Sequence, residues 1–187
     1  MKEVLYTRHG LTSWNIEGRL QGRSDIPLST EGVEQVKHLG ESLKNQGIEL
    51  VVASPLLRTF ETGKIIAEIC DVPIETDSDL IERDFGTFEG LYRATLVEEH
   101  GLKPGQPLSE ILPPDAEQLD VVAARVWPVI EKIMSRPEKI LVISHAGVFR
   151  ALWNSRINEE FSELKFGHVL QFVNNENNWS AKPVELN

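Results

Sequence analysis

The sequence predicts an α/β sandwich, because short apolar segments of strand type alternate along the chain with longer amphipathic segments of helical type. The segments 50–53 and 140–143 are apolar throughout, as expected for strands that are covered on both faces of a parallel sheet. The length of 187 residues favours a single domain over residues 1–187.

The N-terminal segment predicts a strand, a loop and a helix in that order. Residues 2–7 form the strand, and the polar, glycine-containing stretch 11–27 forms the loop. Ser29 or Thr30 then caps a helix that runs to about Gln46.

The next segment predicts a strand, a helix and a further strand. Residues 50–53 form the first strand. Ser54 is a suitable N-cap with Pro55 as the first helical residue, so we expect a helix from there to about Cys70. A third strand is expected near residues 72–75.

The middle of the chain is the least regular part of the sequence. Residues 76–90 are acidic and contain glycine, which predicts a loop. Residues 91–114 combine a short helical pattern with several glycines and prolines, so we interpret them as a flap or insertion. Asp115 then caps a helix that is expected to reach about Ser135.

The C-terminal part predicts one more strand–helix unit and a hairpin. Residues 140–143 form the strand, and a helix follows over about 146–154. Two strands are expected at 168–174 and at about 179–184, joined by the turn-like residues 175–178.

Composition narrows the class of protein. The chain is 41% hydrophobic and 26% charged, which is typical of a soluble domain with a core. No apolar run approaches the ~20 residues of a membrane span, and the first residues lack the long apolar stretch expected of a signal peptide. Cys70 is the single cysteine, which excludes an internal disulfide framework. These features favour a cytoplasmic protein.

The formal net charge of −10 bears on the partners of the protein. It argues against binding of nucleic acid or of an anionic membrane, because both need a basic face. It favours a small phosphorylated or otherwise anionic ligand held in a local cationic site. The sequence leaves the oligomeric state open, and a homodimer remains an alternative.

Cationic residues follow three of the predicted strands. Arg8 and His9 follow the first strand, Arg58 follows the second, and His145 follows the strand at 140–143. Ligands of open parallel sheets bind beyond the carboxyl ends of the strands. We therefore expect these four side chains to form one cationic pocket that is suited to a phosphoryl group, with two imidazoles available for chemistry.

Each of these groups also has an ordinary structural explanation. His9 can belong to an unremarkable strand-end loop, and His145 can bond to a carbonyl. Arg58 opposes the dipole of its helix, which suggests an external anion, but it can instead pair with Glu61. The coincidence of three such strand ends favours the pocket over these separate explanations.

The residues alone do not select a proton donor. Five carboxylates are candidates, namely Asp77, Asp79, Glu82, Asp84 and Glu89. Four polar residues of the first loop can reach a phosphate or face water, namely Asn15, Arg19, Gln21 and Arg23.

Four motifs occur in a fixed order along the chain. The first comprises residues 7–15 with 20–32, the second residues 54–59, the third residues 80–90, and the fourth residues 142–147. Together they closely resemble the signature of the histidine phosphatase superfamily, also called phosphoglycerate mutase-like. Each motif is modest alone, but the ordered set is highly specific.

The resemblance implies a three-layer α/β/α fold with a six-stranded, mostly parallel sheet. It implies that His9 attacks phosphorus and carries a phosphohistidine. Arg8, Arg58 and His145 would hold the phosphoryl oxygens and stabilise their charge in the transition state. Glu82 would protonate the leaving oxygen and then activate water, so we expect it to be partly buried with its charged form disfavoured.

The resemblance also implies the remaining site residues. Asn15, Gln21, Gly22 and Ala146 would assist in binding the phosphoryl group. Arg93 stands where mutases place a lysine that contacts substrate, so it would extend anion recognition beyond the phosphate. No metal and no cofactor are expected, because arginine and histidine supply the positive charge.

The flap distinguishes the functions that this superfamily includes. Cofactor-dependent mutases carry an adjacent arginine pair in the inserted region, whereas residues 91–114 contain only Arg93 and Lys103 as cations. We therefore predict a phosphatase that hydrolyses a small phosphomonoester, with a phosphoglycerate mutase as the alternative. The third alternative is a non-catalytic module that binds a phospho-ligand or a protein, but His9, Glu82 and His145 are all retained. The natural substrate is not revealed.

Overall fold

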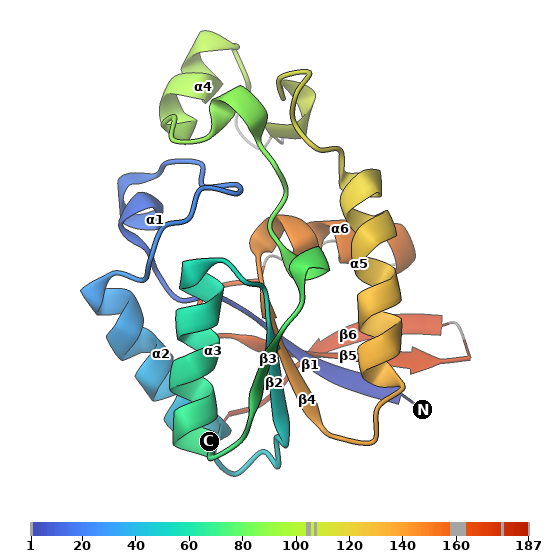
Figure 1. Cartoon of the computed structure of the whole chain (residues 1–187). Coiled ribbons are helices and arrows are strands. Elements are labelled where there is room, and N and C mark those ends of the chain that lie inside the picture. The colour runs from blue at the N-terminus through green and yellow to red at the C-terminus, as the bar shows by residue number, and fades with distance from the viewer. Residues whose placement is uncertain (1, 104–105, 107, 158–163, 177, 187) are drawn as a thin grey trace.

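Among the described residues, six strands form one sheet in the order β3-β2-β4-β1-β5-β6, as the computed structural model shows (Figure 1). The structure describes residues 2–103, 106, 108–157, 164–176 and 178–186. The strands are β1 (Lys2–Arg8), β2 (Leu50–Ala53), β3 (Ile74–Thr76), β4 (Ile140–Ser144), β5 (Val169–Asn175) and β6 (Asn178–Pro183). Of these six, β5 alone runs against the others, which confirms a mostly parallel sheet.

Helices cover both faces of the sheet and make the three predicted layers (Figure 1). The four main helices are α2 (Thr30–Leu43), α3 (Leu57–Cys70), α5 (Leu119–Met134) and α6 (Ala146–Arg156). The side chains of β1 alternate between the layers: Val4 and Tyr6 pack in the core with α5 and α6, whereas Leu5 packs with α2 and α3.

The strand register brings the predicted site residues to one edge of the sheet. Arg8 in β1 pairs with Ser144 in β4, and Ala53 in β2 pairs with Ile143 in β4. Because these three strands are parallel and end at the same level, the residues that follow them lie together. The pocket predicted at the strand ends therefore has its structural basis in the pairing of β1, β4 and β2.

Two predicted helix starts are wrong, and both errors involve a side chain that bonds elsewhere. The helix after β2 begins at Leu57 rather than at Pro55, and Ser54 Oγ lies 2.9 Å from His145 Nε2 instead of capping it. The helix expected from Asp115 begins at Leu119, while the Asp115 carboxylate accepts a hydrogen bond from the Thr87 amide at 2.9 Å. In both cases a tertiary contact replaces the local cap.

Several loops contain short regular segments that the sequence did not predict. The first loop holds helix α1 (Ser13–Glu17), and the acidic loop holds two 3₁₀ helices, η1 (Ser78–Leu80) and η2 (Gly86–Phe88). Strand β3 lies slightly later than the expected segment.

The predicted flap contains helix α4 (Arg93–Glu99) and the 3₁₀ helix η3 (Leu108–Glu110). Leu96 and Leu108 are buried and serve packing, whereas Leu91 and Tyr92 are exposed. Residues 104, 105 and 107 of the predicted flap, and residue 177 of the predicted hairpin turn, lie outside the described residues. In the described part of the chain, no helix has both the length and the apolar character that crossing a membrane requires.

Candidate active site

A cavity of about 250 Å³ lies where the predicted site residues converge. Nine of the ten line it, namely Arg8, His9, Asn15, Gln21, Gly22, Arg58, Glu82, Arg93 and Ala146. The tenth, His145, is fully buried with its ring centre 5.3 Å from that of His9. The sequence therefore located the components of one cavity.

His9 has its ring orientation fixed by its own loop. The Nδ1 atom lies 2.7 Å from the Gly10 carbonyl oxygen, and because a carbonyl can only accept, Nδ1 is the protonated nitrogen. This leaves Nε2 with its lone pair available. Burial, together with the charges of Arg8 and Arg58, lowers the pKa of His9 well below its usual value. His9 is therefore a neutral imidazole at neutral pH.

Arg58 is completely buried and is tied to the loop that follows α1. Its Nη1 donates to the Ser24 carbonyl at 2.8 Å and its Nη2 to the Gly22 carbonyl at 2.7 Å. Its Nε has no hydrogen-bond partner among the described residues. The alternative surface pairing with Glu61 is absent from the described contacts, and Glu61 accepts from the Leu28 amide instead.

His145 is the N-cap residue of α6 and packs behind His9. Its Nε2 lies 2.9 Å from Ser54 Oγ, and its carbonyl accepts from the Tyr6 hydroxyl at 3.1 Å. Its buried Nδ1 has no partner among the described residues. Burial, and then the charge of Arg58, lowers the pKa of His145 well below its usual value.

Phe166 is a site neighbour that the sequence did not identify. The guanidinium carbon of Arg8 lies 4.0 Å from the centre of the Phe166 ring, and the same ring lies 6.1 Å from that of His9. This cation–π contact orients Arg8 without consuming a hydrogen-bond donor.

Glu82 is buried, as predicted, and its carboxylate caps α6. It accepts hydrogen bonds from the amides of Gly147 at 3.1 Å, Val148 at 3.2 Å and Arg83 at 2.8 Å. Two amides at the start of α6, those of Gly147 and Val148, therefore bind Glu82. A side chain at position 147 would place its Cβ 2.4 Å from Glu82 Oε1, so the close approach requires glycine.

The other carboxylates considered as proton donors are not among the described residues that line the cavity. Asp77 accepts from the Asp79 amide at the start of η1. Asp84 accepts from the Gly86 amide and pairs with Arg23 at 3.5 Å. Of the described residues that line the cavity, Glu82 is the one with a carboxylate.

Asn15 and Gln21 are held by a shared partner, Thr12. Thr12 Oγ1 lies 3.0 Å from Asn15 Oδ1 and 3.0 Å from Gln21 Oε1, and Asn15 completes a capping box at the start of α1. Arg19 also lines the cavity and donates to the Tyr92 hydroxyl at 2.7 Å, whereas Arg23 is directed away into ion pairs.

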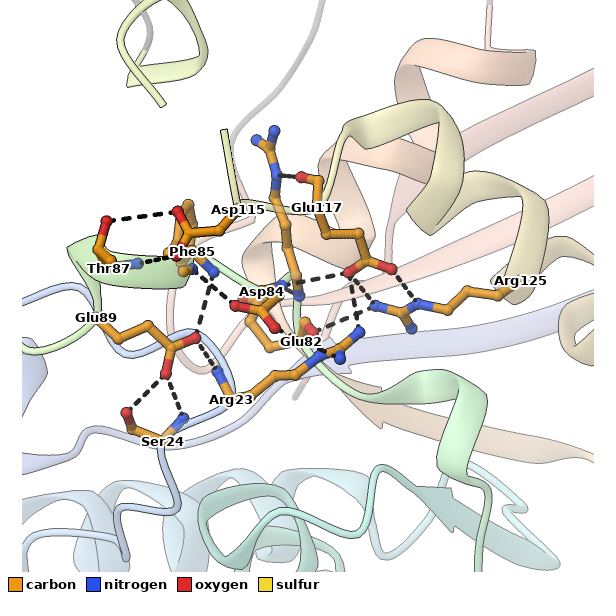
Figure 2. Close-up of polar contacts among 12 residues, drawn as sticks. Arg23, Ser24, Glu82, Asp84, Phe85, Thr87, Glu89, Asp115, Glu117 and Arg125 are labelled. Atoms are coloured by element: carbon orange, nitrogen blue, oxygen red, sulfur yellow. Dashed lines mark hydrogen bonds and ion pairs between the residues drawn. The ribbon is translucent and has the colours of Figure 1, made fainter. Parts of the chain in front are cut away.

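Glu89 has a role that the sequence did not assign, although it lies within the third motif. Its carboxylate accepts from the Arg23 amide at 2.7 Å and from the Ser24 amide and hydroxyl at 2.9 and 2.8 Å (Figure 2). Gly22 has a positive φ of 52°, and a Cβ there would lie 1.9 Å from Glu89. Glu89 therefore fixes the loop whose carbonyls hold Arg58.

Glu117 holds the segment that carries Glu82, as Glu89 holds the loop at residues 23–24 (Figure 2). It accepts from Arg125 at 2.9 and 3.0 Å and from the Asp84 amide at 3.3 Å, and it pairs with Arg23 at 3.3 Å. Arg125 also donates to the Glu82 carbonyl at 3.2 Å. Burial raises the pKa of Glu117, but Arg125, the Asp84 amide and Arg23 together lower it below its usual value, so the carboxylate is charged.

Within the part of the chain that the structure describes, no group of three or more histidine, cysteine or acidic side chains is arranged to hold a metal ion. The positive charge of the described cavity comes from arginine.

The family model described as histidine phosphatase superfamily, branch 1, matches residues 4–174. The chain belongs to this superfamily. Its curated relatives carry two kinds of name. A probable phosphoglycerate mutase, GpmB, of Proteus mirabilis (strain HI4320) is 36% identical over 152 residues, which cover 78% of this chain and 70% of the relative. An uncharacterized phosphatase, PhoE, of Bacillus subtilis (strain 168) is 33% identical over 154 residues, 81% of this chain and 76% of the relative.

Solved structures support the same fold. A mycobacterial glucosyl-3-phosphoglycerate phosphatase, solved in complex with VO₃, superimposes with a TM-score of 0.86 over 98% of both chains, at 22% sequence identity. At this identity the similarity establishes the histidine phosphatase fold. The specific activity is argued from the geometry of the site.

Proposed function

We propose that this protein is a phosphatase that hydrolyses a small phosphomonoester through a phosphohistidine, without a metal or a cofactor. The observation that carries the proposal is the geometry of His9. Its Nδ1 is anchored on the Gly10 carbonyl, and its neutral ring lies in the same cavity as Arg8 and Arg58. A neutral nucleophile between two guanidinium groups is suited to attack on a phosphoryl group.

The residues support a two-step reaction. In the first step, His9 Nε2 bonds to phosphorus while the bond from phosphorus to the ester oxygen breaks and Glu82 gives that oxygen a proton. In the second step, Glu82 takes a proton from water, which attacks phosphorus and releases phosphate and free His9. Arg8, Arg58 and the Nδ1 of His145 would stabilise the charge on the phosphoryl oxygens in both steps.

A phosphoglycerate mutase is the second candidate. The names of several curated relatives favour it, and so does the presence of Arg93 in the cavity. The retained His9, Glu82 and His145 weigh against a non-catalytic module that only binds a phospho-ligand or a protein.

Incubation with 3-phosphoglycerate and a trace of 2,3-bisphosphoglycerate separates the two activities. We expect release of inorganic phosphate to exceed formation of 2-phosphoglycerate. Isomerisation that outpaces phosphate release would replace the phosphatase by the mutase.

Trapping of the phosphoenzyme tests the nucleophile. Acid quenching of the wild type during turnover should leave an acid-labile phosphoryl group on the protein. His9→Ala should form none and lose at least about 10⁴-fold in kcat. His38→Ala, a change at an exposed position of α2, is the matched control and should behave as wild type. Full activity of His9→Ala would refute the assignment.

A further inference from the structure

Ser54 and His145 lie side by side because the strands that precede them are paired. Strands β2 and β4 are parallel with Ala53 opposite Ile143, and the Ser54 amide donates to the Ile143 carbonyl at 3.0 Å. The first residue after β2 therefore lies beside the first residue after β4. Both Ser54 and His145 are completely buried, and Ser54 Oγ lies 2.9 Å from His145 Nε2. The sheet register thus places a hydroxyl against one nitrogen of this imidazole.

The direction of this hydrogen bond follows from the other contacts of Ser54. Apart from His145, the described contacts give Ser54 Oγ only the Leu56 amide, at 3.5 Å, and an amide N–H can only donate. Among the described residues, the hydroxyl proton of Ser54 therefore has a single acceptor, His145 Nε2. If Nε2 carried a proton instead, the buried hydroxyl would be left without an acceptor, which is costly. Ser54 therefore donates and Nε2 accepts.

This direction decides which nitrogen of His145 carries the ring proton. Burial, and then the charge of Arg58, lowers the pKa of His145 well below its usual value, so the ring is neutral at neutral pH and has one N–H. Because Nε2 is the acceptor, that proton lies on Nδ1. The Nδ1 atom is buried and has no partner among the described residues. A buried N–H donor therefore remains without an acceptor.

His145 is also held in place beside the proposed nucleophile. The centre of its ring lies 5.3 Å from that of His9, and the next residue, Ala146, lines the cavity. The carbonyl of His145 accepts from the Tyr6 hydroxyl at 3.1 Å. Burial raises the pKa of Tyr6, so this hydroxyl keeps its proton and stays a donor. Two buried hydroxyl groups thus fix the backbone and the ring of His145.

Building on the proposed phosphatase function, we infer that Ser54 is a positioning residue whose hydroxyl donates to His145 Nε2 and thereby keeps the ring proton on Nδ1, where it is donated to a phosphoryl oxygen. Ser54 itself is not among the described residues that line the cavity. An imidazole with its proton on Nε2 would turn a lone pair toward the phosphoryl oxygens and repel their charge. Removal of the Ser54 hydroxyl therefore changes the tautomer of His145.

NMR of protein labelled with nitrogen-15 in its histidine rings tests the tautomer without a substrate. Long-range proton–nitrogen correlations distinguish a ring protonated on Nδ1 from one protonated on Nε2, and the signals that disappear in His145→Gln assign this ring. We expect the wild type at neutral pH to show the Nδ1–H tautomer alone, and inorganic phosphate to shift its Nδ1 signals. Ser54→Ala should show the Nε2–H tautomer or a mixture of the two.

Ser144→Ala is the matched control. Ser144 is also a completely buried serine beside the strand ends, but its hydroxyl donates to the Leu80 carbonyl at 2.8 Å. This variant should keep the Nδ1–H tautomer of His145. Ser54→Thr retains a hydroxyl donor and should keep the tautomer too. If Ser54→Thr does not fold, Ser54→Cys should give an intermediate mixture, because a thiol is a weaker donor.

Inhibition by vanadate and steady-state turnover measure the consequence for the phosphoryl group. Ser54→Ala should weaken inhibition by vanadate about 10–100-fold and should lower kcat by a similar factor, because one donor to the phosphoryl oxygens is lost from part of the molecules. KM should change less, since the charge on these oxygens is greatest in the transition state. Ser54→Thr should recover most of the loss, and Ser144→Ala should lose less than about threefold.

Four results would overturn the inference. The first is the Nε2–H tautomer of His145 in the wild type, and the second is an Nδ1–H tautomer that persists alone in Ser54→Ala. The third is an Nδ1 signal that inorganic phosphate leaves in place. The fourth is an equal loss of activity in Ser54→Ala and Ser144→Ala.

Hydrolysis by the wild type separates this inference from the proposed function. Absence of phosphate release from every ester, with the tautomer dependent on Ser54 as expected, would refute the phosphatase and leave the hold of Ser54 on His145 standing. Release of phosphate by a wild type whose His145 is protonated on Nε2 would do the reverse.

Discussion

The two sides of the cavity are built by different means. On the phosphoryl side, Arg8, His9, Arg58 and His145 follow parallel strands, and the register of the sheet places them together. On the leaving-group side, Glu82 and its neighbours lie in an irregular segment with short 3₁₀ helices. The phosphoryl side therefore depends on backbone pairing, whereas the other side depends on side-chain contacts.

The carboxylates that connect the two sides explain how the irregular segment is held in place. Glu117 holds the Asp84 amide and Arg125, which in turn holds the Glu82 carbonyl. Glu89 extends from the same irregular segment to the loop that positions Arg58. The nucleophile and the phosphoryl contacts are thus anchored in the sheet, while the segment that carries the proton donor is held by side-chain hydrogen bonds and partly exposed ion pairs.

Glu82→Gln should have the largest effect, and it should impair the leaving-group side of the cavity while leaving the phosphoryl side intact. We expect it to slow hydrolysis of alkyl phosphates by roughly 10²–10⁴-fold, because the leaving oxygen loses its proton donor. The effect should be smaller for p-nitrophenyl phosphate, whose leaving group needs no proton. Steady-state kinetics on both esters measures the difference, and an equal loss for both would show that Glu82 is no general acid.

Glu89→Gln should weaken binding of the phosphoryl group, because Glu89 holds the loop that positions Arg58. The amide keeps an acceptor but loses the charge that binds the loop at residues 23–24, so we expect kcat/KM to fall about 10–100-fold, equivalent to the ~1–3 kcal/mol of such a contact. The loss should be similar for all esters, with weaker inhibition by inorganic phosphate.

Glu99→Gln, at an exposed position of α4, is the matched control for Glu89→Gln and should be silent. If Glu89→Gln lowered only the thermal stability and left phosphate inhibition intact, Glu89 would have no role in positioning the loop.

The pH dependence of stability should reveal the two buried imidazoles of the phosphoryl side. Burial lowers the pKa of both His9 and His145, so the unfolded chain takes up protons near the usual value of 6.5 while the folded protein does not. Their contribution to stability is thus complete above about pH 6.5 and is lost as the pH falls toward the lowered values. Each histidine should contribute up to about 1.4 kcal/mol per pH unit in this window.

Urea unfolding between pH 7 and 5.5 measures this dependence. His9→Gln should reduce the slope by about half, whereas His38→Gln on the surface should leave it unchanged. A wild-type stability that is flat over this range would contradict the burial of neutral imidazoles.

The strands and most of the site follow from local sequence patterns. The apolar runs that form β2 and β4 predicted buried strands. Arg8 and His9 lie at the end of β1, and Arg58 and His145 follow β2 and β4, so their positions after the strands predicted the pocket. The residues alone could not select Glu82 from the five candidate carboxylates. The resemblance carried by the ordered motifs selected it. These features need only short-range pattern and the geometry of a parallel sheet.

Other features were decided only by tertiary structure, because their partners are distant in the sequence. Ser54 has the residue type of an N-cap, yet it binds His145, 91 positions away. Asp115 likewise binds Thr87 instead of capping its helix. Glu89 acts on Ser24, 65 positions away, and the partnerless Nη2 of Arg83 becomes apparent only when the surrounding atoms are in place. The sequence by itself thus determined the strands and the cations that follow them. The tertiary structure decided which polar side chains bind one another and which buried polar atoms have no partner among the described residues.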